Sequence, residues 1–290
     1  MSKILVSGSM AYDNLFKFEG NLSESFEGLD FNNLSVSFST SERTVHFGGC
    51  AGNTAYGLRK MNLDPVILAG VGDDFENYGN WLQDLGIKTD FIDVYEGVKT
   101  AAAFIVSDSA GRQVTIFDSG AMDLKPHGFE KLVDIASELV LSIVGPDAED
   151  RMKQSVQFCL DHNVPFIFDP GQRVNVLSTD FLELACGRAL GVIVNAYEYE
   201  MLKKRLKGEL ETKFTLITLG SEGCKVIEGG NEIIVSTRPI ENPVDPTGAG
   251  DAFRAGFIAA YIKGASIEEA CAKANELAGE SMMFKGTQNY

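Results

Sequence analysis

The sequence has few of the residues that build metal centres or disulfide frameworks. Its 5 cysteines are scattered along 290 residues without a CxxC pair, and the 3 histidines lie apart from them. An odd, dispersed set of cysteines is typical of a protein kept in a reducing compartment, and zinc ligation would need closer spacing. We therefore expect reduced thiols, most of them packed in the core, and a cytoplasmic location.

Long apolar runs and basic clusters are also missing. The N-terminal apolar run, residues 4–6, is far too short for a signal peptide or a membrane span, and no later run reaches spanning length. With 41 acidic against 25 basic residues the formal net charge is -16, which argues against nucleic acid or an anionic membrane as a partner. We expect small-molecule partners, and an anionic one must be held by local backbone dipoles and a metal ion.

The sequence does contain a regular alternation of short apolar runs with amphipathic stretches of helical length. The runs expected to be buried strands are 4–6, 66–71, 139–144, 166–168, 192–194 and 216–219. The expected helices lie near 51–61, 75–85, 127–137, 147–162, 179–188, 197–206, 249–263 and 267–283. This alternation predicts an α/β fold in three layers, with helices on both faces of a mainly parallel sheet. Ligands bind such sheets beyond the carboxyl ends of the strands, where Asp169 and Asn195 close two of the runs.

Two regions break this alternation and follow a period of two, which is typical of half-buried antiparallel strands. The segments with this pattern are 34–38, 45–47, 100–106 and 112–118. We expect one compact domain over residues 1–290. A small β-sheet from approximately 14–47 and 97–120 would cover its ligand crevice as a lid.

The strongest chemical signal is a glycine-rich stretch late in the chain, DPTGAGDAFRAGF at residues 245–257. Thr247 is expected to be the N-cap of a helix that follows. The residues expected to offer backbone N–H groups to a phosphoryl group, as an anion hole, are Gly248, Ala249 and Gly250. Asp251, in the first helical turn, is placed to accept the proton of an attacking hydroxyl. The alternative is an ordinary glycine-rich turn in which Asp251 complements the helix dipole.

This stretch resembles the C-terminal signature of the ribokinase-like (PfkB) carbohydrate and nucleoside kinases. A second stretch, HFGGCAGNTA at residues 46–55, is similar to the family's N-terminal signature. The resemblance implies that Gly48, Gly49 and Asn53 border the sugar. It also implies that Asp13 accepts hydrogen bonds from two ribose hydroxyls, and one carboxylate suits a vicinal diol because two acceptors face two donors. From the residues alone, Asp13 also suits a turn cap, and the glycine pair also suits a tight strand-to-helix turn.

A third match concerns metal binding. The stretch Asn195-Ala196-Tyr197-Glu198 is similar to the family's NxxE motif, which implies that Glu198 helps to hold Mg²⁺, in part through water, and that Asn195 helps to organise the ATP phosphates. From the residues alone, the same pair also suits a helix capping box. The resemblance further implies a monovalent-cation site, such as one for K⁺, with oxygens from Asp245, Thr247 and Ser281.

The remaining matches concern ATP. The stretch TLGSEG, residues 218–223, resembles the loop that lies along the nucleotide, although a tight turn between strands is the alternative. The resemblance implies an ATP-binding set composed of Asn195, Thr218, Gly220, Gly223, Thr247 and Asn275.

Several stretches are most similar to bacterial adenosine kinases of this family. They are residues 34–38, 47–53, 118–122, 168–172 and 285–289. The resemblance implies transfer of the γ-phosphoryl of ATP to the 5'-hydroxyl of adenosine, and an apolar slot for the base. The candidates for that slot, each of which also suits lid packing, are Phe38, Phe104, Phe117 and Met122. The alternatives are a ribokinase- or fructokinase-type sugar kinase, a kinase of another nucleoside, and a non-catalytic nucleoside-binding regulator. Monomer and homodimer both remain open.

Overall fold

A nine-stranded sheet forms the centre of the protein, whose residues 2–28, 35–208, 210 and 212–290 are described by a computed structural model. The strand order is β13-β12-β11-β10-β9-β8-β1-β4-β5. The strands from β5 to β11 in this order pair in parallel, and β12 and β13 add an antiparallel edge. The bounds are β1 Lys3–Ser7, β4 Asp64–Gly72, β5 Ile92–Tyr95, β8 Leu139–Val144, β9 Phe166–Phe168, β10 Gly191–Asn195, β11 Phe214–Thr218, β12 Cys224–Glu228 and β13 Asn231–Val235.

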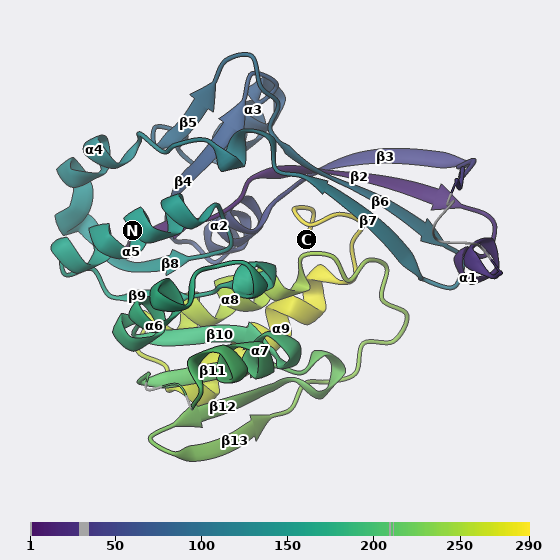
Figure 1. The fold of residues 1–290 in the computed structure, drawn as a ribbon. Coiled ribbons are helices and arrows are strands. Elements are labelled where there is room, and N and C mark those ends of the chain that lie inside the picture. The colour runs from purple at the N-terminus through teal and green to yellow at the C-terminus, as the bar shows by residue number, and fades with distance from the viewer. Residues whose placement is uncertain (1, 29–34, 209, 211) are drawn as a thin grey trace.

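Helices cover both faces of this sheet, so the expected three-layer α/β arrangement is confirmed (Figure 1). The helices of the body are α2 Cys50–Lys60, α3 Glu76–Asp84, α4 Phe129–Leu132, α5 Glu149–Asp161, α6 Thr179–Arg188, α7 Ala196–Leu206, α8 Ala249–Tyr261 and α9 Ile267–Ser281. The run of apolar residues in β1 is unbroken because both faces of the strand are buried. Ile4 and Val6 pack in the core under α2, α8 and α9, while Leu5 packs in the core under α5, α6 and α7.

Two expectations about the body need correction. The helix expected near 127–137 is broken, because α4 passes into a 3-10 segment, Val133–Glu138, that leads directly into β8. The strands β5, β12 and β13 were not predicted. Gly229 and Gly230, both with positive φ, form the turn that joins β12 to β13, and a Gly-Gly pair between apolar runs is itself a hairpin signal.

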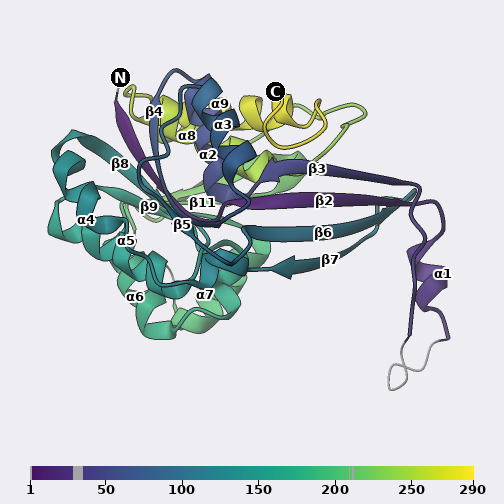
Figure 2. The ribbon, with the colours of Figure 1, turned by 90° about the horizontal axis from the view of Figure 1, so that it is seen from above.

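A separate four-stranded sheet, in the order β3-β2-β6-β7, projects from the body (Figures 1 and 2). Its strands are β2 Ala11–Phe18, β3 Glu42–Gly48, β6 Ala101–Asp108 and β7 Gln113–Asp118, and the short helix α1 Leu22–Phe26 lies at its far end. Only β2 and β6 pair in parallel. Two chain excursions thus build one sheet.

The first of these excursions differs from expectation. Leu34 of the expected strand 34–38 lies outside the described residues, and residues 35–38 form no strand. The inner position of the sheet belongs to β2, which was not predicted and pairs with β3 and β6 on its two sides. The alternation of apolar and polar residues in β2 is interrupted by Asn14, which is buried. Its side-chain oxygen accepts a hydrogen bond from Arg43 on β3, at 2.9 Å. Side-chain pairing of this kind is invisible to a local pattern.

Two smaller expectations concern cysteines and membranes. All 5 cysteines are free, and each of them except Cys50 is buried. None of the described helices combines the length and the apolar character needed to cross a membrane.

Candidate active site

The start of α8 is shaped by one glycine. Gly248 is the N-cap with a φ of 78°, a left-handed conformation that glycine adopts without a steric penalty. Thr247 is therefore not the N-cap, contrary to expectation; its backbone N–H instead donates to Oδ1 of Asp245 at 2.9 Å. The turn leaves Asp251 in the first helical turn, as expected, with 9% of its surface exposed.

The carboxylate of Asp251 is held by two neighbours from the glycine-rich motif at residues 46–55. Nδ2 of Asn53 on α2 donates to its Oδ2 at 2.9 Å, and the thiol of Cys50 donates to it as well. Burial raises the pKa of Asp251 to about 6, against the lowering effect of the Arg254 charge and these hydrogen bonds. A carboxylate that titrates just below neutral pH is mostly ionised in the cell and well suited to act as a general base.

Asp13 lies on β2 and pairs with His46 of β3, at the start of the motif at residues 46–55. A Cβ added to Gly48 would lie 2.2 Å from its Oδ2, and one added to Gly49 would lie 2.6 Å from the backbone of Met10. Both positions need glycine because Asp13 and the backbone of β2 approach them closely. The pair also forms the turn from strand β3 to helix α2, so the alternative interpretation applies as well. Burial raises the pKa of Asp13 to about 7, and the charges of Asp251 and Asp245 add to the shift. The structure therefore brings the expected sugar contacts together beside Asp251.

The C-terminal tail completes this cluster, although no site role was predicted for its residues. Oγ1 of Thr287 lies 2.7 Å from Oδ1 of Asn53 and 2.8 Å from the carbonyl oxygen of Phe47, so its one proton is shared between two acceptors. Gln288 donates through Nε2 to the same Asn53 oxygen at 3.1 Å. Both donors fix the amide of Asn53 so that its NH₂ faces Asp251. The N–H of Gly286 also donates to Oδ2 of Asp245 at 3.0 Å. Only the fold reveals these contacts, because more than two hundred residues separate the tail from Asn53.

A cavity of about 420 Å³ lies between the start of α8, the β11–β12 turn and α9. Most of the residues expected at ATP line it together with part of the anion hole: Thr218, Gly220, Gly223, Asn275, Ala249 and Gly250. The turn between β11 and β12 is tight, with positive φ at Gly220 and Gly223, so the alternative interpretation of this loop also holds. The opposite wall of the cavity was not predicted and includes Thr237, Arg238 and Ile240.

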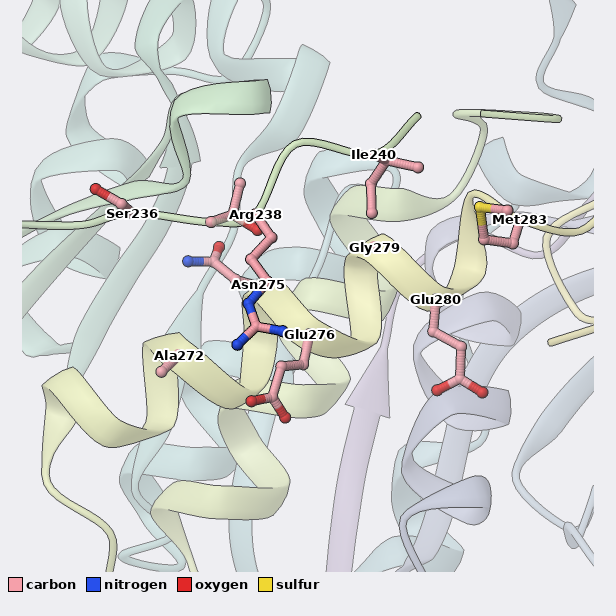
Figure 3. A pocket seen from close by; sticks show the side chains of 10 residues that line it. Ser236, Arg238, Ile240, Ala272, Asn275, Glu276, Gly279, Glu280 and Met283 are labelled. Atoms are coloured by element: carbon pink, nitrogen blue, oxygen red, sulfur yellow. The ribbon is translucent and has the colours of Figure 1, made fainter. Parts of the chain in front are cut away.

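A second hollow, of about 470 Å³, continues this cavity along α9 (Figure 3). The two share Arg238, Asn275 and Gly279 among their lining residues. In Figure 3 the side chain of Arg238 reaches over α9 toward Glu276. The amide of Asn275 donates to the carbonyl of Val235 at 3.0 Å, so its orientation is fixed by β13.

Asn195 and Glu198 form a complete capping box at the start of α7. Oδ1 of Asn195 accepts from the N–H of Glu198, and Oε2 of Glu198 accepts from the N–H of Asn195, both at 2.8 Å. Burial raises the pKa of Glu198. Neither residue, nor Thr247, lines the 420 Å³ cavity. The structure thus displays the capping role of this pair, and its role toward magnesium stays a prediction.

The expected cation oxygens are engaged within the protein. Asp245 accepts from Thr247 through Oδ1 and from Gly286 through Oδ2, and Ser281 donates to the carbonyl of Ala278 at 2.8 Å. Across residues 2–28, 35–208, 210 and 212–290, no group of three or more His, Cys, Asp or Glu side chains is arranged to hold a metal. A magnesium ion held mainly by ATP phosphates and water fits such a donor set.

The four residues expected to contact the nucleobase lie in different parts of the structure. Phe117 is registered with Ala103, which is registered with Asp13, so all three lie on one face of the projecting sheet. Phe104 lies on the opposite face, and Met122 is buried in a small cluster with Ala11 and Ala101. Phe38 packs on the rings of Phe18 and Phe26 near α1. Of the four, Phe117 is the one placed to contact a nucleobase above Asp13, and 50% of its surface is exposed.

Comparisons with known proteins find kinases among the relatives of this chain. A family model described as "pfkB family carbohydrate kinase" matches residues 21–290. A nucleoside kinase of Methanocaldococcus jannaschii is 29% identical over 280 residues, covering 93% of this chain and 86% of that protein. Ribokinase of Bacillus subtilis is 27% identical over 258 residues, covering 86% of this chain and 85% of that protein. The structure of Burkholderia thailandensis nucleoside kinase in complex with inosine superposes with a TM-score of 0.86 at 29% identity, covering 99% of this chain and 93% of that chain.

Proposed function

The chain belongs to the pfkB family of carbohydrate kinases, and from this premise we propose that it phosphorylates the 5'-hydroxyl of a purine nucleoside with ATP. The coarser assignment, a nucleoside or sugar kinase of the ribokinase-like class, follows from the relatives. Adenosine is the acceptor that the sequence favours. Inosine is its nearest competitor, since the similar Burkholderia kinase binds it.

The observation that carries this proposal is the placement of two carboxylates in one buried site. Asp13 lies against Gly48, where a diol can approach the backbone, and Asp251 lies at the start of α8 beside the cavity lined by Ala249 and Gly250. A sugar held by Asp13 and Asn53 would present its primary hydroxyl to Asp251. A purely binding protein needs no such base, so a non-catalytic regulator is the weaker interpretation.

The transfer moves one proton and one phosphoryl group. Asp251 takes the proton of the 5'-hydroxyl, the oxygen forms a bond to the γ-phosphorus, and the bond from that phosphorus to the β-bridging oxygen breaks, with its electron pair leaving on ADP. The backbone N–H groups of residues 248–250 stabilise the charge on the phosphoryl group. Glu198 would help to hold a magnesium ion through water, and such an ion supplies charge neutralisation to the phosphates. The projecting sheet acts as a lid that excludes water over the sugar.

The test is an ADP-release assay with adenosine, inosine, cytidine, ribose and fructose as acceptors, each with ATP and magnesium, with and without potassium. We expect the purine nucleosides to give the highest kcat/KM. Turnover of ribose or fructose above that of every nucleoside would replace the proposal with a sugar kinase. Heat stabilisation by adenosine without any ADP release would favour the regulator.

A further inference from the structure

We propose that Arg254 is a further catalytic residue, whose guanidinium group binds an oxygen of the γ-phosphoryl during transfer. The inference rests on the proposed kinase function and adds a protein cation to its transition state. Arg254 lies on α8 three residues after Asp251, so both side chains leave the helix on one face.

The guanidinium group lies against the expected anion hole. A Cβ added to Gly250 would lie 2.8 Å from Nη1 of Arg254, which places this nitrogen beside the backbone that offers N–H groups to phosphate. Nε of Arg254 donates to Oδ2 of Asp169, the residue that follows β9. Asp169 is 1% exposed and itself accepts from the N–H of Gly171 at 3.0 Å. The arginine is therefore anchored at one nitrogen only, with its anchor fixed by the sheet.

The other guanidinium nitrogens remain available to a ligand. Within the described parts of the chain, the hydrogen bond to Asp169 is the one that the guanidinium makes. The Arg254 side chain is 11% exposed, and its terminal nitrogens are not among the enclosed polar atoms that lack a partner. Arginine presents planar N–H groups that match two oxygens of a phosphoryl group.

Charge balance supports the same assignment. The carboxylates of Asp251, Asp169 and Glu198 all interact with Arg254, and ATP would bring further negative charge into this site. A cation here offsets both. A buried ion pair by itself contributes little to stability, so pairing with Asp169 alone does not account for an arginine whose terminal nitrogens stay open beside Gly250.

Two variants test the proposal by kinetics. Arg254→Lys keeps the charge and the ion pair, while Arg254→Gln removes the charge. We expect kcat to fall by roughly 10-fold for the first and about 100-fold for the second, the size of effect seen when one transition-state donor is lost. Arg205→Lys is the matched control, because Arg205 on α7 bonds to Thr179 at 3.2 Å away from the cavity. Its kcat should equal that of the wild type.

A binding arm separates this proposal from the proposed function. Calorimetry with ADP and with a non-hydrolysable ATP analogue measures the contribution of the γ-phosphoryl without any acceptor, so it applies even if the kinase substrate proves different. Arg254→Gln should lose the preference for the analogue over ADP and bind ADP as the wild type does. Addition of guanidinium ion to Arg254→Ala should restore part of kcat.

Unchanged kinetics in the Arg254 variants would overturn the proposal. If both variants melt at a lower temperature but keep wild-type kcat and the same preference for the analogue, Arg254 is a structural partner of Asp169 and the proposal is wrong. If Arg254→Gln fails to fold, the same kinetics and calorimetry on Arg254→Lys decide, since the lysine can still pair with Asp169. Wild-type protein that releases no ADP with any acceptor refutes the kinase assignment, while the binding arm still decides the role of Arg254.

Discussion

Nδ2 of Asn53 and Oδ2 of Asp251 lie 2.9 Å apart, although 198 residues separate them in the chain. The bond joins the two glycine-rich motifs into one unit, with α2 supplying a donor and α8 the carboxylate. Because the amide donates to the ionised form, it lowers the pKa of Asp251 against the effect of burial. The residue expected to border the sugar therefore also keeps the proposed base in its working state.

Replacement of the proposed general base should remove most of the turnover and leave binding intact. For Asp251→Asn we expect kcat to fall about 1,000-fold, because a general base contributes on this order to the rate. The shape of the site is nearly unchanged, so calorimetry should give ADP and adenosine affinities close to those of the wild type. Asp150→Asn, an exposed aspartate at the start of α5, is the control. Near-full activity of Asp251→Asn would show that another group takes the proton.

Asp13 should stabilise the protein when it is neutral and destabilise it when it is charged. Its pKa is raised from 3.8 to about 7 by burial and by the charges of Asp251 and Asp245. In the unfolded chain it ionises near pH 4, so its contribution to stability falls as pH rises from about 4 to about 7. Asp13→Asn mimics the neutral form.

The measurement is the melting temperature at several pH values. Asp13→Asn should match the wild type near pH 4 and melt about 5 °C higher at pH 8, while its KM for the nucleoside rises because the diol acceptor is lost. Asp150→Asn should follow the wild type at every pH. A variant that is less stable than the wild type at pH 8 would mean that the Asp13 carboxylate is stabilised by partners in solution.

Thr287 should act on the chemistry through Asn53. In Thr287→Val the side chain keeps its shape but loses the hydroxyl that lies 2.7 Å from Oδ1 of Asn53 and 2.8 Å from the carbonyl oxygen of Phe47. The amide is then held at Oδ1 by Gln288 alone and turns its oxygen toward Asp251 more readily, which would raise the pKa of this carboxylate. We expect the acid limb of the kcat/KM profile to move to higher pH, and kcat/KM at neutral pH to fall roughly 10-fold.

The tail offers its own control for this experiment. Asn289 lies two residues further on and donates to the carbonyl of Lys285 at 2.7 Å, not to Asn53. Asn289→Ala should leave the pH profile unchanged. If Thr287→Val loses activity equally at all pH values, the tail has a structural role only.

Much of the fold was accessible from local pattern. The helices α2, α6 and α9 begin within one residue of expectation, because capping and apolar spacing are local. The strand β2 was not accessible, since its alternation is broken by Asp13 and by the buried Asn14, whose partner Arg43 comes from another strand. Strand 34–38 was expected instead, because its alternating pattern fits a sheet whether or not a neighbouring strand exists to pair with it.

Some residues of the site could be predicted from the sequence and others could not. The glycines of the two motifs and the carboxylate of Asp251 were identified from the sequence, because each motif is one contiguous stretch that resembles a signature of the family. Arg254 stands inside the quoted motif, yet its meaning depends on Asp169, which lies 85 residues away. Thr287 and Gln288 likewise gain a role only through Asn53. Tertiary contacts of this length leave no periodic trace in a single sequence.

A substitution at Gly48 should weaken sugar binding without affecting ATP binding. A Cβ at this position would lie 2.2 Å from Oδ2 of Asp13, far inside normal contact, so Gly48→Ala must displace the carboxylate from the site. Because Gly48 has no positive φ, the effect is one of space and not of backbone strain. We expect KM for the nucleoside to rise about 100-fold, the loss of roughly two hydrogen bonds, with KM for ATP unchanged. Gly187→Ala is the matched control, since a Cβ there meets nothing within 4 Å and should only favour the helix slightly. Equal increases in both KM values for Gly48→Ala would mean that Asp13 serves the whole site and not the sugar alone.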